Sequence, residues 1–211
     1  MKDCCMFNHI YVFSRAEAVR YCKLNNDVDS IIIAISDPNM KYEEETFISD
    51  TNGVKDILRL SFCDADRLYG TDVYGREAQN VITREDAKAI REFIENHRGI
   101  DIVIVHCDAG ISRSAGVAAG ILAGTIGDDT QIFDNHSYYP NMLCYRTVLE
   151  EFMTVYAKWI TSKYYGYLVC SNCKDCYIEE DWISENSGKW SHCPSCGATM
   201  IYDKLEVVNN E

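Results

Sequence analysis

The chain has 211 residues, of which 47% are hydrophobic and 25% charged, so it is long enough and apolar enough to bury a substantial core. Its formal net charge of −13 argues against non-specific binding to nucleic acid or to anionic membranes, because both depend on basic patches. The first residues lack the apolar stretch of a signal peptide, and no apolar run is long enough to span a bilayer. We therefore expect a cytoplasmic protein.

The first part of the chain predicts three strands and one helix. A short β-type run covers residues 9–13. Ser14 and Glu17 follow it in the pattern of a capping box, which begins a helix. Residues 30–36 are apolar on both faces, as in a central parallel strand, and residues 54–62 predict a third strand.

The next part continues the alternation of helices and strands. Thr83 is the expected N-cap of a helix that runs to about His97, and an apolar strand follows at residues 100–106. A helix begins near Arg113, and residues 141–163 predict a second long helix. This alternation predicts an α/β fold with a central, mostly parallel sheet flanked by helices. Functional sites of such sheets lie at the carboxyl ends of the strands.

The composition and the hydrophobic pattern of the sequence change near Lys163. The residues that follow have no helical period and are rich in cysteine and acidic residues. The sequence therefore predicts two domains, a larger one over residues 1–163 and a small one over residues 164–211.

A cysteine ends the buried strand at 100–106, and an arginine opens the next helix. A strand that turns straight into a helix directs backbone N–H groups and a helix N-terminus into one small space, which suits an oxyanion such as phosphate. The same dipoles favour the thiolate of Cys107, so this residue is the predicted nucleophile. Gly110 permits the tight turn, and Arg113 offers a planar fork for two phosphate oxygens. Ser114 is placed to hydrogen-bond the thiolate.

The segment from His106 to Ser114, His-Cys-Asp-Ala-Gly-Ile-Ser-Arg-Ser, resembles the phosphate-binding loop of cysteine-based protein tyrosine phosphatases, including the dual-specificity group. More closely, the chain resembles small bacterial and phage-type phosphatase-like proteins of that superfamily, with looser matches at 12–15, 33–38 and 140–141. These matches cover roughly the first 160 residues, an ordinary domain size. The resemblance implies a thiophosphoryl intermediate on the cysteine. It also implies a set of phosphate-binding residues: Asp108, Ala109, Gly110, Ile111, Ser112 and Arg113.

The reaction that the resemblance implies also needs a general acid for the leaving oxygen. The family places this aspartate on a loop after an upstream strand, in a Trp-Pro-Asp sequence that this chain lacks. Asp64, Asp66 and Asp72 follow the third predicted strand. Placement at a strand end favours Asp64, with Asp66 next, and the choice among the three stays open.

The loop adds no lysine, whereas a polyphosphorylated substrate would call for further cations around it. A phosphomonoester on a protein or small molecule therefore fits better, with phosphotyrosine as the first choice and phosphoserine or phosphothreonine as further ones. The predicted activity is that of a phosphatase without a catalytic cofactor. The alternative is an adaptor that binds phosphate without turnover, and a rhodanese-like sulfur carrier is a distant third.

Eleven cysteines without a secretory signal favour metal binding and catalysis over a disulfide framework. Two Cys-x-x-Cys pairs, separated by nineteen residues, match a tetrahedral structural zinc site and resemble a zinc ribbon. The predicted Zn²⁺ ligands are Cys170, Cys173, Cys193 and Cys196. Cys176 and His192 are alternative ligands.

The residues after 163 hold three lysines against eight acidic residues, so this segment lacks the basic face that nucleic-acid binding needs. We expect it to dock onto the phosphatase domain or onto a partner protein. Its aromatic residues are the expected core of the small domain: Tyr177, Trp182, Trp190 and Tyr202.

Overall fold

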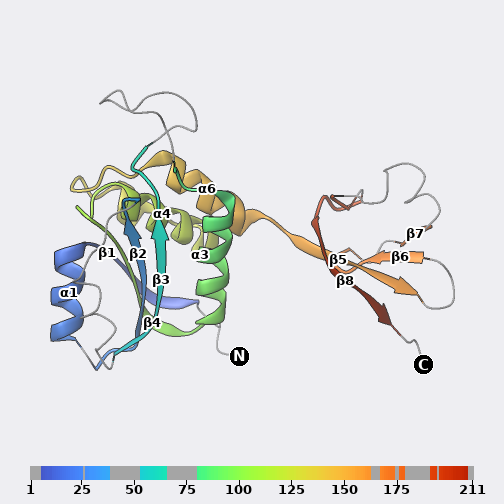
Figure 1. Ribbon diagram of the computed structural model, residues 1–211, viewed down its shortest axis with the longest axis horizontal. Helices are drawn as coiled ribbons and strands as arrows, with labels where there is room; N and C mark the ends of the chain where they lie inside the picture. The colour runs from blue at the N-terminus through green and yellow to red at the C-terminus, as the bar shows by residue number, and fades with distance from the viewer. Residues whose placement is uncertain are drawn as a thin grey trace. The chain divides into compact units, whose positions relative to one another are not determined.

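The computed structural model describes residues 6–25, 27–38, 53–65, 80–162, 167–173, 176–178, 191–193 and 195–208 (Figure 1). The chain forms two compact units, Met1–Phe152 and Met153–Glu211. Each unit has its own sheet and its own hydrophobic core.

The first unit is built on a four-stranded parallel sheet with the order β1-β4-β2-β3. The strands are β1 (Phe7–Ser14), β2 (Ser30–Ser36), β3 (Val54–Ser61) and β4 (Ile100–Cys107). β4 and β2 occupy the centre, and both are almost entirely buried, in keeping with their continuous apolar sequences. The predicted α/β architecture with a central parallel sheet is confirmed.

Helices cover both faces of this sheet (Figure 1). They are α1 (Arg15–Leu24), α3 (Arg84–Asn96), α4 (Arg113–Ile126), the short α5 (Thr130–Phe133) and α6 (Met142–Met153). Helix α1 packs on the face that carries Ile32 and Ile104, while α3, α4 and α6 contribute to the core on the face that carries Ile33 and Val105. None of the helices within the described ranges is long and apolar enough to cross a membrane.

Two capping boxes fix where α1 and α3 begin, as the sequence predicts. The Ser14 hydroxyl accepts from the Glu17 backbone N–H at 3.3 Å, and the Glu17 carboxylate accepts from the Ser14 N–H at 2.8 Å. Thr83 and Asp86 form the same reciprocal pair. Each cap contributes about 1 kcal/mol. Because Ser14 is also the last residue of β1, the cap places Arg15 at the carboxyl edge of the sheet.

Three glycines on one side of α4 allow α6 to pack unusually close. A Cβ atom would lie 2.4 Å from the Asn141 carbonyl oxygen at Gly116, and 2.4 Å from the Phe152 Cβ at Gly124. At Gly120 it would lie 2.8 Å from the Val148 Cβ. The small-residue sequence of α4 therefore seats α6 along its length and brings the start of α6 to the start of α4.

The prediction of one long helix over residues 141–163 is wrong for the second half of that range. Helix α6 ends at Met153, and Tyr156–Ser162 forms strand β5 of the second unit. In this strand Ala157 and Trp159 are buried and Lys158 between them is not, which is the alternation of a strand. The β-branched residues nearby favour the extended state. The compact units consequently divide earlier in the chain than the predicted boundary at 163.

The second unit has a four-stranded sheet with the order β7-β6-β5-β8. Its other strands are β6 (Tyr167–Cys170), β7 (Cys176–Ile178) and β8 (Thr199–Val208). β5 pairs with β6 antiparallel and with β8 parallel. Trp159, Leu168 and Met200 form its core together with buried cysteines. The aromatic side chains predicted for this core lie outside the described residues or side chains: Tyr177, Trp182, Trp190 and Tyr202.

Candidate active site and metal centre

The loop between β4 and α4 encloses the side chain of Cys107, which is 2% exposed. The backbone N–H of Gly110 donates to its Sγ atom at 3.3 Å, and the Oγ of Ser114 lies 3.1 Å from the same sulfur. Two hydrogen-bonding groups therefore converge on a sulfur at the carboxyl end of a central strand. The Gly110 N–H directs its hydrogen at this sulfur, and the Ser114 hydroxyl is able to do so as well.

Gly110 is the one loop position where the backbone leaves no room for a side chain of any size. Its φ of +72° lies in the left-handed region. A Cβ atom there would lie 2.3 Å from the Ser14 backbone nitrogen and 2.5 Å from the Phe13 carbonyl carbon. The loop therefore rests directly on the end of β1, and glycine is what permits this contact.

Arg113 is buried at the first turn of α4, and its guanidinium is held by groups that follow the ends of three strands, β2, β3 and β4. Nη1 donates to Asp37 Oδ1 at 2.8 Å and to the Phe62 carbonyl oxygen at 2.9 Å, and Nη2 donates to Asp108 Oδ2 at 3.1 Å. Burial by itself lowers the pKa of Arg113, but the carboxylates of Asp37 and Asp108 help to raise that pKa above its ordinary value. The Nε–H is buried and makes no hydrogen bond within the described part of the chain.

Asp108 joins this guanidinium to a second one. Arg15, at the start of α1, is 5% exposed and donates to Asp108 Oδ1 through Nη2 at 3.1 Å and Nε at 3.3 Å. Sequence reasoning gave no role to Asp37 or Arg15. Both directly follow the last residue of a strand, β2 and β1 respectively, and the strand-end rule that selected Asp64 would have found them as well.

Among the three aspartates predicted as the general acid, Asp64 lies at the loop. Its Oδ1 accepts from Ser112 Oγ at 2.8 Å and from Asn141 Nδ2 at 2.9 Å. The side chain is otherwise exposed. Asp66 and Asp72 lie outside the described residues.

Asn141 is the buried residue that connects the acid-bearing segment to the loop. Its Oδ1 accepts from the Cys144 N–H at 2.9 Å, which caps α6, and its backbone N–H donates to the Ser112 carbonyl at 3.1 Å. Its Nδ2 also donates to the Ala65 carbonyl at 3.2 Å. The sequence offered Asn141 only as part of a looser match, without a role.

The remaining predicted phosphate-binding residues form the outer side of the loop. Ala109 and Ile111 are both exposed, Ile111 by 41%. The Ile111 carbonyl accepts from the Tyr139 N–H at 3.0 Å, and the Tyr139 side chain is 76% exposed. Apolar surface therefore adjoins the polar groups of the loop.

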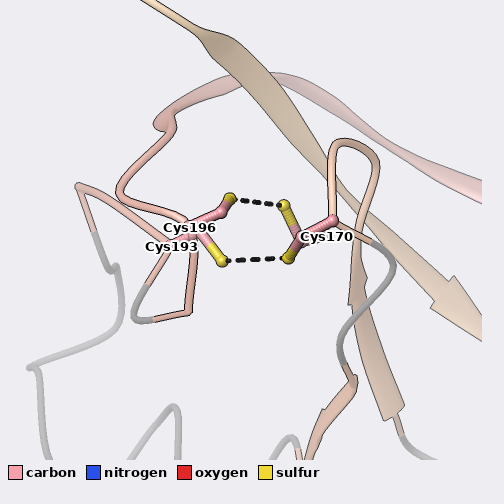
Figure 2. A group of neighbouring side chains, drawn as sticks. Cys170, Cys193 and Cys196 are labelled. Atoms are coloured by element: carbon pink, nitrogen blue, oxygen red, sulfur yellow. Dashed lines mark hydrogen bonds between the residues drawn. The ribbon is translucent and has the colours of Figure 1, made fainter.

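The four cysteines predicted as metal ligands come together in the second unit. The Sγ atoms of Cys170, Cys173, Cys193 and Cys196 all lie within 4.8 Å of one another, and this group could hold a metal ion. Figure 2 shows the sulfurs of two opposing segments facing each other, with Cys170 on one segment and Cys193 and Cys196 on the other.

The sulfur separations fit a tetrahedral zinc site. Cys170 and Cys196 have their Sγ atoms 3.8 Å apart, and those of Cys173 and Cys193 are 3.7 Å apart (Figure 2). Zn–S bonds of about 2.3 Å in a tetrahedron put neighbouring sulfurs about 3.8 Å apart. The separations are far longer than the bond of a disulfide, about 2.0 Å, so the four cysteines are thiols and not disulfide partners.

The second Cys-x-x-Cys pair forms the knuckle that such a site needs. Gly197 has a φ of +71°, its N–H donates to the Cys193 carbonyl at 2.8 Å, and the Cys193 N–H donates to the Ala198 carbonyl at 2.9 Å. Hydrogen bonds from the Asn172 amide and from the Ala198 backbone lower the pKa of Cys196 to about 6. A thiolate is the form that binds a metal ion.

The alternative ligands have different positions. His192 lies outside the four-cysteine cluster, and its Nδ1 is 3.0 Å from Ser191 Oγ. The side chain of Cys176, at the start of β7, is not among those described.

Fold and site together define an α/β protein with a tight loop around Cys107 at the end of the central strand β4, and a second unit with a four-cysteine cluster. No family model matches the chain, and no curated protein matches it in sequence.

Several solved structures resemble part of the chain. PTPMT1 in complex with PI(5)P is 17% identical, with a TM-score of 0.42, covering 68% of this chain and 90% of that one. The human tyrosine phosphatase-like serine/threonine/tyrosine-interacting protein is 20% identical, with a TM-score of 0.44, covering 67% and 89%. The PTP-2 phosphatase of Cydia pomonella is 16% identical, with a TM-score of 0.43, covering 78% and 94%.

Proposed function

We propose that the chain is a phosphoric monoester hydrolase in which Cys107 is the nucleophile. The observation that carries this proposal is the convergence of the Gly110 N–H and the Ser114 hydroxyl on the Cys107 sulfur, directly before the N-terminus of α4. A buried structural cysteine has no need of two donors and of a glycine forced against the neighbouring strand. A nucleophilic thiolate is stabilised by such hydrogen bonds and by the helix N-terminus beside it.

The substrate phosphoryl group binds in the loop from Asp108 to Arg113. Its oxygens accept from backbone N–H groups of the loop, which precede the positive end of the α4 dipole. The buried Nε–H of Arg113 has no hydrogen-bond partner within the described residues, and a phosphoryl oxygen supplies one. The hydrogen bonds of Arg113 to Asp37 and Phe62 hold its guanidinium in place for this contact.

In the first step the Cys107 thiolate attacks phosphorus, so that an S–P bond forms as the ester P–O bond breaks. The electron pair of the broken bond goes to the leaving oxygen, and Asp64 protonates that oxygen. Asp64 is our choice among the aspartates because it lies one hydrogen bond from Ser112 of the loop.

In the second step a water molecule attacks phosphorus and gives its proton to the Asp64 carboxylate. The S–P bond breaks, inorganic phosphate leaves, and the electron pair returns to Cys107 as a thiolate. The Ser114 hydroxyl, 3.1 Å from this sulfur, stabilises the thiolate as it leaves.

Phosphotyrosine on a protein is the substrate that the surface around the loop favours, with phosphoserine and phosphothreonine next. Ile111 and Tyr139 offer exposed apolar area beside the loop for an aromatic ring. Asp37, Asp64 and Asp108 place three carboxylates around the two arginines. These carboxylates disfavour a substrate with several phosphates, because they would repel its additional negative charges.

The test compares the wild type with Cys107→Ser and Arg113→Lys on nitrophenyl phosphate, a phosphotyrosyl peptide, a phosphoseryl peptide and an inositol polyphosphate. Phosphate release from the first two, lost in both variants, supports the proposal. Preference for the inositol polyphosphate would contradict the substrate assignment. Equal, near-blank rates in the wild type and Cys107→Ser, with phosphopeptide still retained, would favour the phosphate-binding adaptor instead.

For the second unit we propose a structural Zn²⁺ ion bound by Cys170, Cys173, Cys193 and Cys196. Four thiolates close the coordination sphere, so the ion holds two segments of the chain together and supplies no reaction chemistry. The chain is then a catalytic domain followed by a zinc-ribbon domain that is available to a partner protein.

A further inference from the structure

The carboxyl group of Asp64 is held through one of its two oxygens. Ser112 Oγ and Asn141 Nδ2 both donate to Oδ1, at 2.8 Å and 2.9 Å. Within the described residues Oδ2 makes no hydrogen bond, and Asp64 is an exposed residue. The two oxygens of this carboxyl group are therefore not equivalent.

The chemistry of the donors decides which oxygen bears a proton. The Asn141 side chain has a carbonyl oxygen and an amide nitrogen, and its neighbours fix their orientation. The Cys144 N–H can only donate, so it faces Oδ1 of Asn141, and Nδ2 then faces Asp64. An amide N–H cannot accept a hydrogen bond. Oδ1 of Asp64 must therefore be an acceptor, and a proton on this carboxyl group sits on Oδ2.

We propose that Asn141 is a positioning residue for the general acid, and that it fixes Oδ2 of Asp64 as the oxygen that transfers the proton. This inference rests on the proposed function, because it needs a reaction in which Asp64 protonates a leaving oxygen. It adds a residue on a distant element, separated from Asp64 by 77 positions in the sequence, to the acid step.

Asn141 is well suited to this task because it is itself held on several sides. It is 4% exposed, its Oδ1 caps α6, and its backbone N–H donates to the Ser112 carbonyl at 3.1 Å. A Cβ atom at Gly116 would lie 2.4 Å from its carbonyl oxygen, so α4 packs tightly against it. Its amide also donates to the Ala65 carbonyl at 3.2 Å. One side chain thus holds the acid-bearing segment against the loop that carries the nucleophile.

A positioning role makes a specific prediction about leaving groups. A poor leaving group, such as an alkyl or unsubstituted phenyl oxygen, needs its proton in the transition state, whereas an activated aryl oxygen leaves as an anion. Loss of the Asn141 amide should therefore slow the reaction of poor leaving groups and spare that of good ones.

The main variant is Asn141→Ser, since serine caps a helix about as well as asparagine but is too short to reach Asp64. We expect kcat/KM for phenyl phosphate, which reports the first step alone, to fall about 10- to 100-fold, up to the lower end of the roughly 10²–10⁴-fold that general acid catalysis contributes. We expect kcat/KM for a dinitrophenyl-type phosphate to change less than about threefold. The plot of log kcat/KM against leaving-group pKa should become steeper, as it should in Asp64→Asn.

A second variant, Asn141→Asp, keeps the size and the cap but lacks the amide N–H, so its plot should steepen as well. Thr83→Ala is the matched control for the loss of a cap, because it removes the N-cap of α3 and touches neither Asp64 nor the loop. It should leave the slope unchanged.

An equal loss for all leaving groups in both Asn141 variants would mean a purely structural role and would overturn the inference, as would an unchanged slope. A steeper slope in Asp64→Asn with a normal slope in both Asn141 variants would keep Asp64 as the acid and reject Asn141. The proposed function fails separately if wild type and Cys107→Ser release phosphate at the same rate from every substrate.

Discussion

Oδ1 of Asp37 lies 2.8 Å from Nη1 of Arg113, and this ion pair joins the end of β2 to the start of α4. The arginine side chain is 5% exposed and the aspartate side chain 47% exposed. Asp37 therefore faces water on one side and holds a buried guanidinium on the other.

The first prediction concerns the variant Asp37→Asn, for which two effects compete. Removing a negative charge lessens repulsion of the substrate, an effect of about 1 kcal/mol at most through water. Loosening a hydrogen bond to a buried charged group costs about 1.5–3 kcal/mol. We expect the second effect to win, so that KM and the inhibition constant of inorganic phosphate both rise about tenfold. Steady-state kinetics decide, and a fall in both constants would show that repulsion dominates.

The second prediction concerns Gly110→Ala. The left-handed φ costs about 1–2 kcal/mol for alanine, and the added carbon would meet the Ser14 nitrogen at 2.3 Å, so the loop must move. We expect activity to fall more than about 100-fold, which corresponds to about 3 kcal/mol of lost transition-state stabilisation.

Gly127→Ala is the matched control for this loop variant. Gly127 caps α4 with a φ of +74°, and an added Cβ meets nothing within 4 Å. This variant should lose about 1 kcal/mol of stability, measured by denaturant unfolding, and keep its activity. Equal activities of the two variants would contradict the close packing of the loop on β1.

The sequence could predict those features whose residues lie close together along the chain. Cys107, Gly110 and Arg113 lie within one short segment, and the apolar strand before them could be recognised by itself. The pairing of Arg113 with Asp37 spans 76 positions, so it depends on β2 lying beside β4, and sequence patterns do not give strand order. The same limit applies to Asn141, whose partner Asp64 follows the edge strand β3.

The end of α6 shows a different limit. The apolar residues of 141–163 follow a helical period long enough to predict a single helix. Trp159 matches that period, yet it is buried in the sheet of the second unit, where its neighbours come from β6 and β8. Contacts with residues far along the chain thus override a local pattern.

The third prediction concerns Ser114→Ala, which removes the hydroxyl 3.1 Å from the Cys107 sulfur. A hydrogen bond to a charged group contributes about 1.5–3 kcal/mol, so breakdown of the thiophosphoryl intermediate should slow about 10- to 100-fold. Rapid mixing with an activated aryl phosphate should then show a burst of phenol followed by slow turnover. A steady state without a burst, at the wild-type rate, would remove Ser114 from the second step.

The fourth prediction concerns Cys22, on the face of α1 that packs against the sheet. Burial raises the pKa of its thiol to about 11. An unfolded thiol ionises at its ordinary, lower pKa, near 8.5. At a pH between these two pKa values the folded chain holds a proton on Cys22 that the unfolded chain has lost. The stability that this thiol contributes is therefore complete below about pH 8 and falls as the pH rises to about 11.

Urea unfolding of wild type and Cys22→Ala across this range tests the linkage. The wild type should lose stability more steeply with pH than the variant. Parallel curves would show that Cys22 does not titrate differently in the two states.

The last prediction concerns the removal of metal from the second unit. Purified chain should contain one Zn²⁺, and a chelator should abolish the folded signal of Trp159, which packs with Cys170 and Cys193 in the same core. Cys173→Ser should lose the metal, whereas Cys63→Ser, in the first unit and outside the cluster, should retain it. Because a closed four-thiolate site carries no reaction chemistry, phosphate release by the chelated chain should stay within about twofold of the untreated rate. Zinc well below one ion per chain, or activity that is lost with the metal and restored with it, would contradict a purely structural site.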